Sequence, residues 1–430
     1  MAACVNKSSS SSSSNTATAS PSVDRSCSNS PSTNSSKKAA HSNSHLQLRK
    51  EEGGENTSIL EEPPQLSPVD KSREHSRGSS PLRNSLHNTN PQSMETCFSS
   101  FDRDGDGFLN YAEFVVLCRA LFRNERDKPY PVEPKRLRDM FDTFDINKDG
   151  LIDINEFELC WQKWIRKIVR PVCCLVVVDV QNDFISGSLA ISNCPAKHNG
   201  EEVVEPINRL LDTVEFDCVY YTLDWHPDNH VSFYDNIHLR KLHGSSSVKT
   251  GEEASLFDTV VFEGPPVMEQ KLWPRHCVQN TWGAKIHENI KIVEGSPFIY
   301  KGTNPEVDSY SAFFDNYKLS KTALDTELMN KGVTDVFVCG IAYDVCVGKT
   351  ALHAIELGYR TIIVDDGCRG ITLEDIVNTK QEVEDGWGAV VQSDEVKPMV
   401  QGRDRRPQLG YKLAMELRKQ IKRIEEENHI

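Results

Sequence analysis

The sequence lacks long apolar runs: none approaches the length of a membrane span, and the Ser-rich N-terminus has no apolar core of a secretory signal. These absences, together with 13 cysteines, predict a soluble intracellular protein, cytosolic or nuclear, with reduced thiols. Positive charge is also scarce, because 49 Lys and Arg face 63 Asp and Glu and leave a net charge of -14. This balance argues against nucleic-acid binding, and it favours small molecules or Ca²⁺ as ligands.

Hydrophobic residues are few for a chain of 430 residues, at 38%, so part of the chain is expected to be unfolded. Residues 1–93 are rich in Ser, Asn, Thr and Pro and have no periodic apolar pattern. We predict that they are disordered, because they cannot bury enough surface to offset the entropy of ordering. The rest divides by composition into residues 94–170, 171–396 and 397–430.

A pattern of oxygen-bearing side chains occurs twice in residues 94–170, starting at Asp102 and again at Asp145. Each copy has the spacing of a twelve-residue calcium loop, with a Gly at the sharp turn and a Glu able to bind through both oxygens at the end. The expected calcium ligands are Asp102, Asp104, Asp106, Phe108, Asn110 and Glu113 in the first loop, and Asp145, Asn147, Asp149, Leu151, Asp153 and Glu156 in the second. Phe108 and Leu151 would bind through their backbone carbonyl oxygens. With apolar residues flanking both loops, the segment resembles a paired EF-hand module.

The sequence leaves open whether this pair senses calcium or uses it to fold, since loop ligands fix neither affinity nor opening. The helix expected after the second loop, residues 154–169, reaches Pro171 and then the first strand of the next domain with almost no linker. We therefore hypothesise that calcium occupancy is mechanically coupled to that strand.

From Pro171 onward, short β-branched runs alternate with helical patterns. This alternation predicts an α/β domain built on a parallel sheet, preceded by the all-α EF-hand pair. The expected strands cover residues 173–178, 218–223, 298–301, 335–339, 361–365 and 388–392. Ligands of open parallel sheets bind beyond the carboxyl ends of the strands, so the residues that follow each run are the candidates for chemistry.

Three strand ends supply a Cys, an Asp and a Lys. Cys346 falls near the exposed N-terminus of an expected helix, where partial positive charge favours the thiolate. Asp179 follows four apolar positions, where an unpaired carboxylate is costly, and Lys301 ends its strand. Together, Lys301 and the helix terminus would lower the thiol pKa while Asp179 exchanges protons. Taken singly, a core thiol, a turn cap and a surface lysine explain them at least as well.

Metal ligands are expected at a further strand end. Asp224 and His226 lie two residues apart in an extended segment, so both side chains point to one face, and His276 is the best third ligand. Two imidazoles and one carboxylate suit Zn²⁺, but also Fe²⁺, Mn²⁺ or Co²⁺. An Asp-x-His pair by itself is equally compatible with solvent-exposed surface.

Five motifs in residues 171–396 together resemble the nicotinamidases of the isochorismatase-like cysteine hydrolases. They are Val178-Asp179-Val180-Gln181-Asn182-Asp183-Phe184, Asp224-Trp225-His226-Pro227, Trp273-Pro274-x-His276-Cys277-Val278, Tyr310-Ser311-Ala312-Phe313 and Gly340-Ile341-Ala342-x-x-x-Cys346-Val347. With the EF-hand pair in front, the whole chain resembles the EF-hand-fused nicotinamidases of invertebrate animals.

The resemblance implies hydrolysis of nicotinamide to nicotinic acid and ammonia through a thioester on Cys346, feeding NAD salvage. It assigns Asp179 as general base and acid, and Lys301 as the residue that holds both in their charged states. It also implies a cis peptide between Ile341 and Ala342, which would point the N–H groups of Ala342 and Cys346 at the developing oxyanion.

The resemblance further implies a metal, commonly zinc, that accepts the pyridine nitrogen of nicotinamide. The ligands would be Asp224, His226 and His276. The ring pocket would be lined by Phe184, Trp273 and Tyr310. Related pyridine or pyrazine carboxamides stay open as substrates.

One long segment departs from the compact family pattern. Residues 236–270 lie between the expected metal ligands and contain a Gly/Ser/Thr-rich patch, so we expect a disordered surface insertion, with a pocket lid as the alternative. Residues 397–430 open with a Pro- and Arg-containing linker and close with a charged helix at about 412–427, expected as a solvated helix on the rim.

A second class of function stays open, namely a calcium-responsive binding protein whose hydrolase-like domain is inert. Within the superfamily that the motifs resemble, isochorismatases lack the nucleophilic cysteine, and amidases acting on carbamoyl substrates generally lack the metal ligands. This chain has both sets. Hydrolysis of nicotinamide that is lost in Cys346→Ala would exclude the binding protein.

Overall fold

The computed structural model describes residues 91–428. The segment predicted to be disordered lies outside the described residues except at its end, because helix α2 begins at Pro91. Within the described residues, no helix is both long and apolar enough to cross a membrane.

Each loop of the EF-hand pair lies between two helices, one that ends just before the loop and one that begins within it. The helices are α2 (Pro91–Phe101), α3 (Tyr111–Leu121), α4 (Pro134–Phe144) and α5 (Ile154–Cys160), the last continued by the π-helical turn η1 (Trp161–Ile165) and by α6 (Arg166–Val169). Asn110 and Asp153 cap α3 and α5, and Glu113 and Glu156 complete a capping box at each start. The strands β1 (Leu109–Asn110) and β2 (Leu151–Ile152) pair antiparallel and join the two loops.

The second part is a six-stranded sheet in the order β10-β9-β8-β3-β4-β7, and every neighbouring pair is parallel. Its strands are β3 (Cys173–Val178), β4 (Cys218–Asp224), β7 (Phe298–Lys301), β8 (Asp335–Ile341), β9 (Arg360–Arg369) and β10 (Ala389–Val391). The predicted strands are confirmed with small changes at their ends. The chain winds from β3 outward through β4 and β7, then returns to place β8 on the other side of β3. Ligand sites of open sheets occur at such a reversal.

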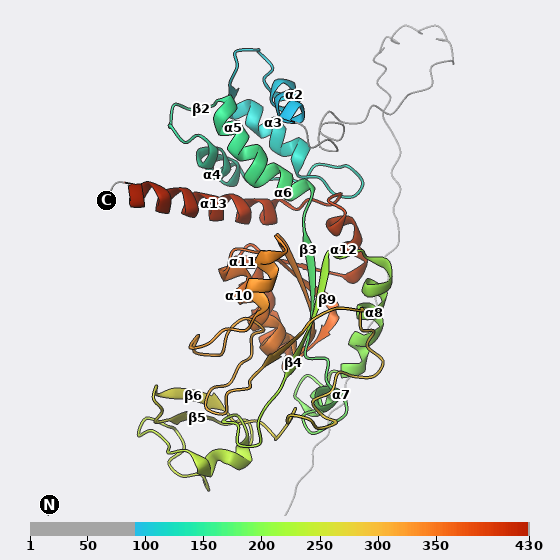
Figure 1. Cartoon of the computed structure of the whole chain (residues 1–430), viewed down its shortest axis with the longest axis vertical. Helices are drawn as coiled ribbons and strands as arrows, with labels where there is room; N and C mark the ends of the chain where they lie inside the picture. Colours follow the sequence, from blue (N-terminus) through green and yellow to red (C-terminus); the bar gives the residue numbers. More distant parts are fainter. Residues whose placement is uncertain (1–90, 429–430) are drawn as a thin grey trace, which may run out of the picture. The chain divides into compact units, whose positions relative to one another are not determined.

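Helices cover both faces of this sheet, with α8 and α12 on one side and α10 and α11 on the other (Figure 1). The helices and helical turns of this part are α7 (Asn182–Ile185), η2 (Ile191–Asn193), η3 (Gly200–Val203), α8 (Val204–Thr213), η4 (Tyr234–Leu239), α9 (Leu324–Asn330), η5 (Tyr343–Val347), α10 (Gly348–Glu356), α11 (Leu373–Asp385) and α12 (Ser393–Val400). All six residues of β3 are buried, as expected for a strand covered on both faces.

The segment 236–270 is folded, so the prediction of a disordered insertion was wrong. It contains the antiparallel hairpin β5 (Thr259–Phe262) and β6 (Met268–Lys271). Apolar side chains of the hairpin and its surroundings form a small core of their own, made of Val231, Ile237, Ala254, Val260, Phe262 and Leu272. The Gly/Ser/Thr-rich patch hid this core because it separates the apolar residues along the sequence.

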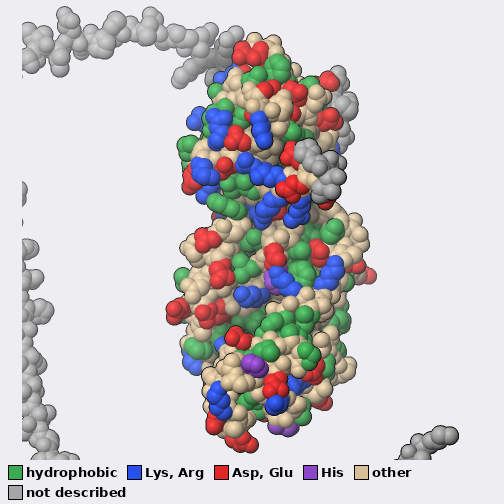
Figure 2. Space-filling view, turned by 90° about the vertical axis from the view of Figure 1, so that its left-hand side faces the viewer, with side chains coloured by type: hydrophobic (Ala, Val, Ile, Leu, Met, Phe, Trp, Pro, Cys, Tyr) green, Lys and Arg blue, Asp and Glu red, His purple; other side chains and the backbone are tan. Residues whose placement is uncertain are grey.

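The C-terminal helix α13 (Pro407–Asn428) is packed on the EF-hand pair, which corrects the expectation of a solvated helix. Its first half contributes Tyr411, Leu413, Ala414 and Leu417 to the apolar core of that pair. Only the second half is mainly exposed. Figure 2 shows Lys and Arg side chains gathered at the height of this helix.

Candidate active site and metal centre

The predicted catalytic residues meet at the carboxyl edge of the sheet. Lys301, the last residue of β7, is 2% exposed. Its Nζ lies 2.8 Å from Oδ2 of Asp179, which follows β3, and 3.5 Å from Sγ of Cys346. It also donates to the carboxylate of Asp224 at the end of β4 and to the carbonyl oxygen of Ser309 at 3.0 Å. One ammonium group therefore holds three side chains together.

Asp179 is fully buried and held from two sides. Besides the ammonium of Lys301, the hydroxyl of Thr222 donates to its Oδ1 at 2.5 Å. Burial raises the pKa of Asp179, Lys301 lowers it, and Asp224 raises it, so that the pKa lies above that of an ordinary aspartate. A carboxylate with a raised pKa can both accept and return a proton.

Cys346 lies in η5, which continues into α10, so its expected place at the start of a helix is confirmed, but it is only 6% exposed and the expected exposure was wrong. Burial raises the pKa of its thiol; Lys301 lowers it, while Asp179 and Asp224 raise it. The pKa is therefore raised and not depressed, because desolvation of the thiolate outweighs the ammonium. One ligand-type atom each from Cys346, Asp179 and Asp224 lie within 4.8 Å of one another, which puts the thiol beside a carboxylate that can take its proton.

The turn before Cys346 contains the expected cis peptide between Ile341 and Ala342. Ala342 and Cys346 both line one pocket, together with the three expected ring contacts. The ring contacts are Phe184, Trp273 and Tyr310, and the remaining pocket residues are Leu189, Ile191, Cys194, Asp224, His276, Asp308, Val345 and Ile371. Trp273 donates its indole N–H to the hydroxyl of Tyr310 at 3.2 Å. The pocket thus has aromatic walls with the thiol among its lining residues.

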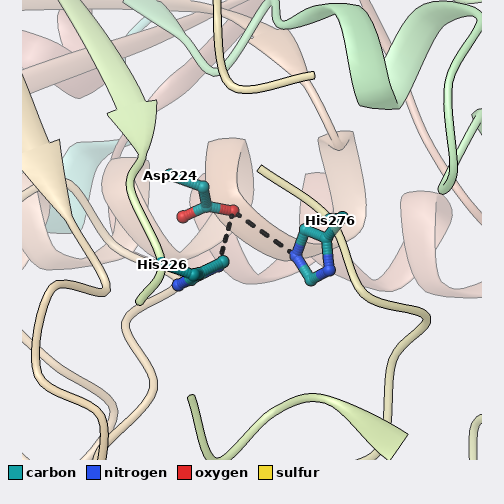
Figure 3. Close-up of side chains that lie close together, drawn as sticks. All are labelled: Asp224, His226 and His276. Carbon is teal, nitrogen blue, oxygen red and sulfur yellow. Dashed lines mark ion pairs between the residues drawn. The ribbon is translucent and has the colours of Figure 1, made fainter. Parts of the chain in front are cut away.

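Asp224, His226 and His276 point toward one another (Figure 3). Oδ2 of Asp224 lies 3.6 Å from Nε2 of His226 and 3.9 Å from Nε2 of His276. These distances are too long for hydrogen bonds, and all three side chains are buried. Three unpaired ligand atoms facing a common point are the arrangement that a metal ion requires.

The tautomers of both histidines fit a metal. Nδ1 of His226 lies 2.9 Å from the carbonyl oxygen of Gly302, and Nδ1 of His276 lies 2.7 Å from that of Pro274. A carbonyl only accepts, so each Nδ1 carries the proton and each Nε2 keeps its lone pair. Burial and His226 lower the pKa of His276 to about 4, so that this ring is neutral at neutral pH. The donor set therefore suits a divalent transition metal.

The first calcium loop brings its acidic residues together. Carboxylate oxygens of Asp102, Asp104 and Glu113 lie within 4.8 Å of one another. Asp102 accepts hydrogen bonds from the amides of Gly105 and Gly107 at 2.8 and 3.1 Å. The other expected ligands, Asp106, Phe108 and Asn110, lie in the same turn. Gly107 has a φ of 86°, as the sharp turn of an EF-hand loop requires.

The carboxylates of the second loop also accept backbone hydrogen bonds, and one buried acceptor has no partner. Glu156 accepts the amides of Ile146, Asn147 and Asp153. Oδ2 of Asp145 accepts the amide of Gly150 at 3.1 Å, but its buried Oδ1 has no hydrogen-bond partner among the described residues. The other expected ligands are Asn147, Asp149, Leu151 and Asp153. An unsatisfied buried carboxylate oxygen is costly, and a bound cation would satisfy it, so the loop fits Ca²⁺.

Two family models match the chain: an isochorismatase domain at residues 173–395 and an EF-hand domain pair at residues 92–160. The first match spans just over half of the chain. The chain belongs to the isochorismatase family.

Relatives of this isochorismatase-family chain include the nicotinamidase of Escherichia coli, 38% identical over 207 residues, which are 47% of this chain and 86% of the relative. The nicotinamidase of Saccharomyces cerevisiae is 32% identical over 221 residues, 48% of this chain and 93% of the relative. A solved nicotinamidase/pyrazinamidase of Acinetobacter baumanii is 34% identical, with 52% of this chain and 98% of that chain covered and a TM-score of 0.44.

Sequence reasoning missed several residues of the isochorismatase-type site. Gln181 ties two strand ends together, because its side-chain amide accepts the backbone N–H of Asp224 at 2.9 Å and donates to the carbonyl of Asp224 at 2.8 Å. The ring of His230 stacks on that of His226 with 4.1 Å between centroids, and Asp308 lines the pocket. His230 follows His226 by four residues, which was an available signal, whereas nothing in the sequence marked Asp308.

Proposed function

We propose that this protein is a nicotinamidase, which hydrolyses nicotinamide to nicotinate and ammonia and thereby supplies NAD salvage. The observation that carries the proposal is the buried Lys301 ammonium, which contacts Asp179, Asp224 and Cys346 beside an aromatic pocket. It links the nucleophile, its base and the metal ligands in one constellation. The relatives in Escherichia coli and Saccharomyces cerevisiae are named nicotinamidases, which supports this reaction over other amide hydrolyses.

In the first stage, Asp179 takes the proton of the Cys346 thiol and the sulfur attacks the carboxamide carbon of the substrate. The negative charge that develops on the amide oxygen is stabilised by the backbone N–H groups of Ala342 and Cys346. Asp179 then gives the proton to the nitrogen, and ammonia leaves as the C–N bond breaks. A thioester between substrate and Cys346 remains.

In the second stage, Asp179 takes a proton from a water molecule, which attacks the thioester carbon. The same N–H groups stabilise the second oxyanion. The C–S bond breaks, the sulfur regains a proton and the carboxylic acid departs. Burial lowers the pKa of Lys301, but the two carboxylates and the thiol around its ammonium raise it by more, so Lys301 stays charged throughout.

A divalent transition metal, most simply Zn²⁺, would be held by Asp224, His226 and His276. When bound, it supplies a Lewis acid that accepts the pyridine nitrogen of the substrate. Gly302 is required for this geometry, because a Cβ at this position would lie 2.3 Å from the ring of His226.

The activity is tested by measuring ammonia release from nicotinamide with purified full-length protein and added zinc. We expect turnover by wild type and none by Cys346→Ala, with Cys339→Ala, a buried thiol in β8, as the matched control. If wild type releases no ammonia, the protein is better explained as a calcium-responsive binding protein whose hydrolase-like domain is inert.

We also propose that both EF-hand loops bind Ca²⁺, supported by the carboxylate cluster of the first loop and by the unpaired oxygen of Asp145 in the second. Isothermal titration of the full-length protein should give two calcium ions per chain. Glu113→Gln and Glu156→Gln should each remove one of them, since position 12 supplies two oxygens. Two ions retained in either variant would contradict the assignment.

We further propose that calcium occupancy acts on the hydrolase site through the junction between α6 and β3. Only three residues separate Val169 from Cys173. The guanidinium of Arg360, at the start of β9, donates to the carbonyl of Lys167 in α6 at 2.6 Å and pairs with Asp335 at the start of β8. Strand β3 leads to Asp179 and strand β8 leads to Cys346. A shift of α6 would therefore affect the positions of both residues.

Contacts of the C-terminal segment with the EF-hand pair also support this coupling. The indole of Trp164 in η1 donates to the carbonyl of Gly410 at 2.8 Å, and the hydroxyl of Tyr130 donates to Asp404 at 2.8 Å. Helix α13 contacts α4 as well as β9. Helix α13 would therefore either resist a calcium-dependent movement of the EF-hand helices or pass it on to β9 of the sheet.

This coupling is tested by comparing kcat, KM and the thermal midpoint in calcium and chelator buffers. We expect the difference between the two buffers to be larger for wild type than for the double variant Glu113→Gln, Glu156→Gln. A chelator also competes for the metal of the active site, and the double variant reports that effect by itself. Identical values for wild type in both buffers would contradict the coupling.

A further inference from the structure

A second carboxylate lies next to the metal ligands without a role in the mechanism above. Asp308 is 3% exposed and lines the same pocket as Cys346 and His276. One of its oxygens lies within 4.8 Å of ring nitrogens of His226 and His230. A buried carboxylate is costly unless it is paired, so its position beside the metal ligands requires an explanation.

The hydrogen bonds of Asp308 come from neutral groups. Its Oδ1 accepts the backbone N–H of Ser309 at 2.8 Å, and its Oδ2 accepts Nε2 of Gln270 at 2.9 Å. Gln270 lies on β6 of the inserted hairpin and is 5% exposed. Nε2 of Gln270 also donates to the carbonyl of Lys271 at 2.8 Å, which fixes the amide with its nitrogen toward Asp308. The carboxylate is thereby oriented but not neutralised.

The sum of the charges around Lys301 indicates that a bound divalent cation would neutralise the charge of Asp308. Lys301 contacts both Asp179 and Asp224, so these three groups carry one negative charge between them. A divalent cation bound there with neutral imidazoles leaves one positive charge in a buried site. The negative charge of Asp308 cancels it, and charge cancellation is strongly favoured where water is excluded.

We propose that Asp308 is a positioning residue. Its negative charge, next to the metal ligands, stabilises the bound divalent cation, and the hydrogen bond from Gln270 keeps Asp308 in place. The inserted segment 236–270 thereby contacts a residue of the active-site wall. This inference rests on the proposed metal centre of the nicotinamidase. It deepens that proposal by assigning residues outside the set Asp224, His226 and His276.

The test is the zinc affinity of full-length protein, measured by competition with a chromophoric chelator in calcium buffer. Asp308→Asn keeps the shape and removes the charge, and should weaken zinc binding by about 10- to 100-fold, as loss of a group behind metal ligands does. Gln270→Met should weaken it less. Glu269→Met, on the exposed face of the same strand, is the matched control and should bind zinc as wild type does.

A purely structural role would appear differently. It would lower the thermal midpoint of the zinc-free Asp308→Asn protein, whereas we expect that midpoint to be unchanged or raised and the zinc-dependent increase to shrink. Wild-type affinity in both Asp308→Asn and Gln270→Met would overturn this inference alone. A wild-type protein that binds no zinc at all would overturn the metal centre, and this inference with it.

Discussion

The two regions of this molecule that we propose to bind cations are built in opposite ways. Each EF-hand loop takes all of its candidate ligands from twelve consecutive residues, starting at Asp102 or Asp145. The active site takes Asp224 and His226 from one strand end and His276 from a loop fifty residues later. The loops can thus be recognised from spacing alone, whereas the active site exists only when the sheet is assembled.

The two regions also differ in how they carry charge. Asp104 and Asp106 are exposed, so water offsets most of their mutual repulsion. Asp179 and Asp224 are buried, and the Lys301 ammonium between them does this instead. Removing a charge should therefore have a local effect in the loops and a large one in the active site.

The largest expected effect comes from Lys301→Met. Removing the ammonium leaves Asp179 and Asp224 buried and facing each other, which should cost roughly 3–5 kcal/mol of stability and at least about 10³-fold in kcat/KM. Urea unfolding and ammonia release measure the two losses. Lys321→Met, an exposed lysine, is the control, and a Lys301 variant as active and stable as this control would break the comparison.

Substitutions in one region should remove the cation of that region and leave the cation of the other region bound. We expect His276→Ala to remove zinc and most nicotinamide turnover while both calcium ions stay bound, because the loop ligands are local. The double variant Glu113→Gln, Glu156→Gln should lose calcium and keep zinc. Metal analysis of the purified proteins gives the result, and loss of calcium binding in His276→Ala would show that the regions are not independent binding units.

The pH dependence of kcat/KM should report the buried base. Burial raises the pKa of Asp179, and only the ionised carboxylate can take the thiol proton. Activity should therefore be lost as pH falls through this raised pKa, above the ordinary value of about 3.9. Circular dichroism at each pH shows whether the protein stays folded. An acid limb at or below the ordinary value would contradict the assignment.

A smaller effect is expected at the contact between α13 and the EF-hand pair. A Cβ at Gly410 would lie 2.3 Å from the ring of Phe122, so Gly410→Ala should destabilise the packing by about 1–3 kcal/mol. The calcium affinity should change with it if α13 is coupled to the loops. Gly244→Ala has open space around it and serves as the control. Equal thermal midpoints for the two variants would show that this contact is not tightly packed.

Several elements could be predicted because their signals are local. The strand runs beginning at Cys173, Cys218 and Asp335 appear where their β-branched patterns placed them, and Asp179, Lys301 and Cys346 follow strands that meet at one edge. The environment of Cys346 was mispredicted, since the position of a residue near a helix start does not reveal what covers it. The same reason explains the errors at residues 236–270 and at α13, whose apolar residues find partners far away in sequence.

The sequence by itself determined the two EF-hand loops, the parallel α/β architecture and the identity of the residues at the strand ends, because short-range spacing and periodicity encode them. Only the tertiary structure decided that Lys301 joins Asp179 to Asp224, that the Cys346 thiol is buried with a raised pKa, and that Gln270 of the inserted hairpin reaches Asp308. Burial and charge pairing depend on which segments pack together, and residues distant in the chain settle that only when the fold is complete.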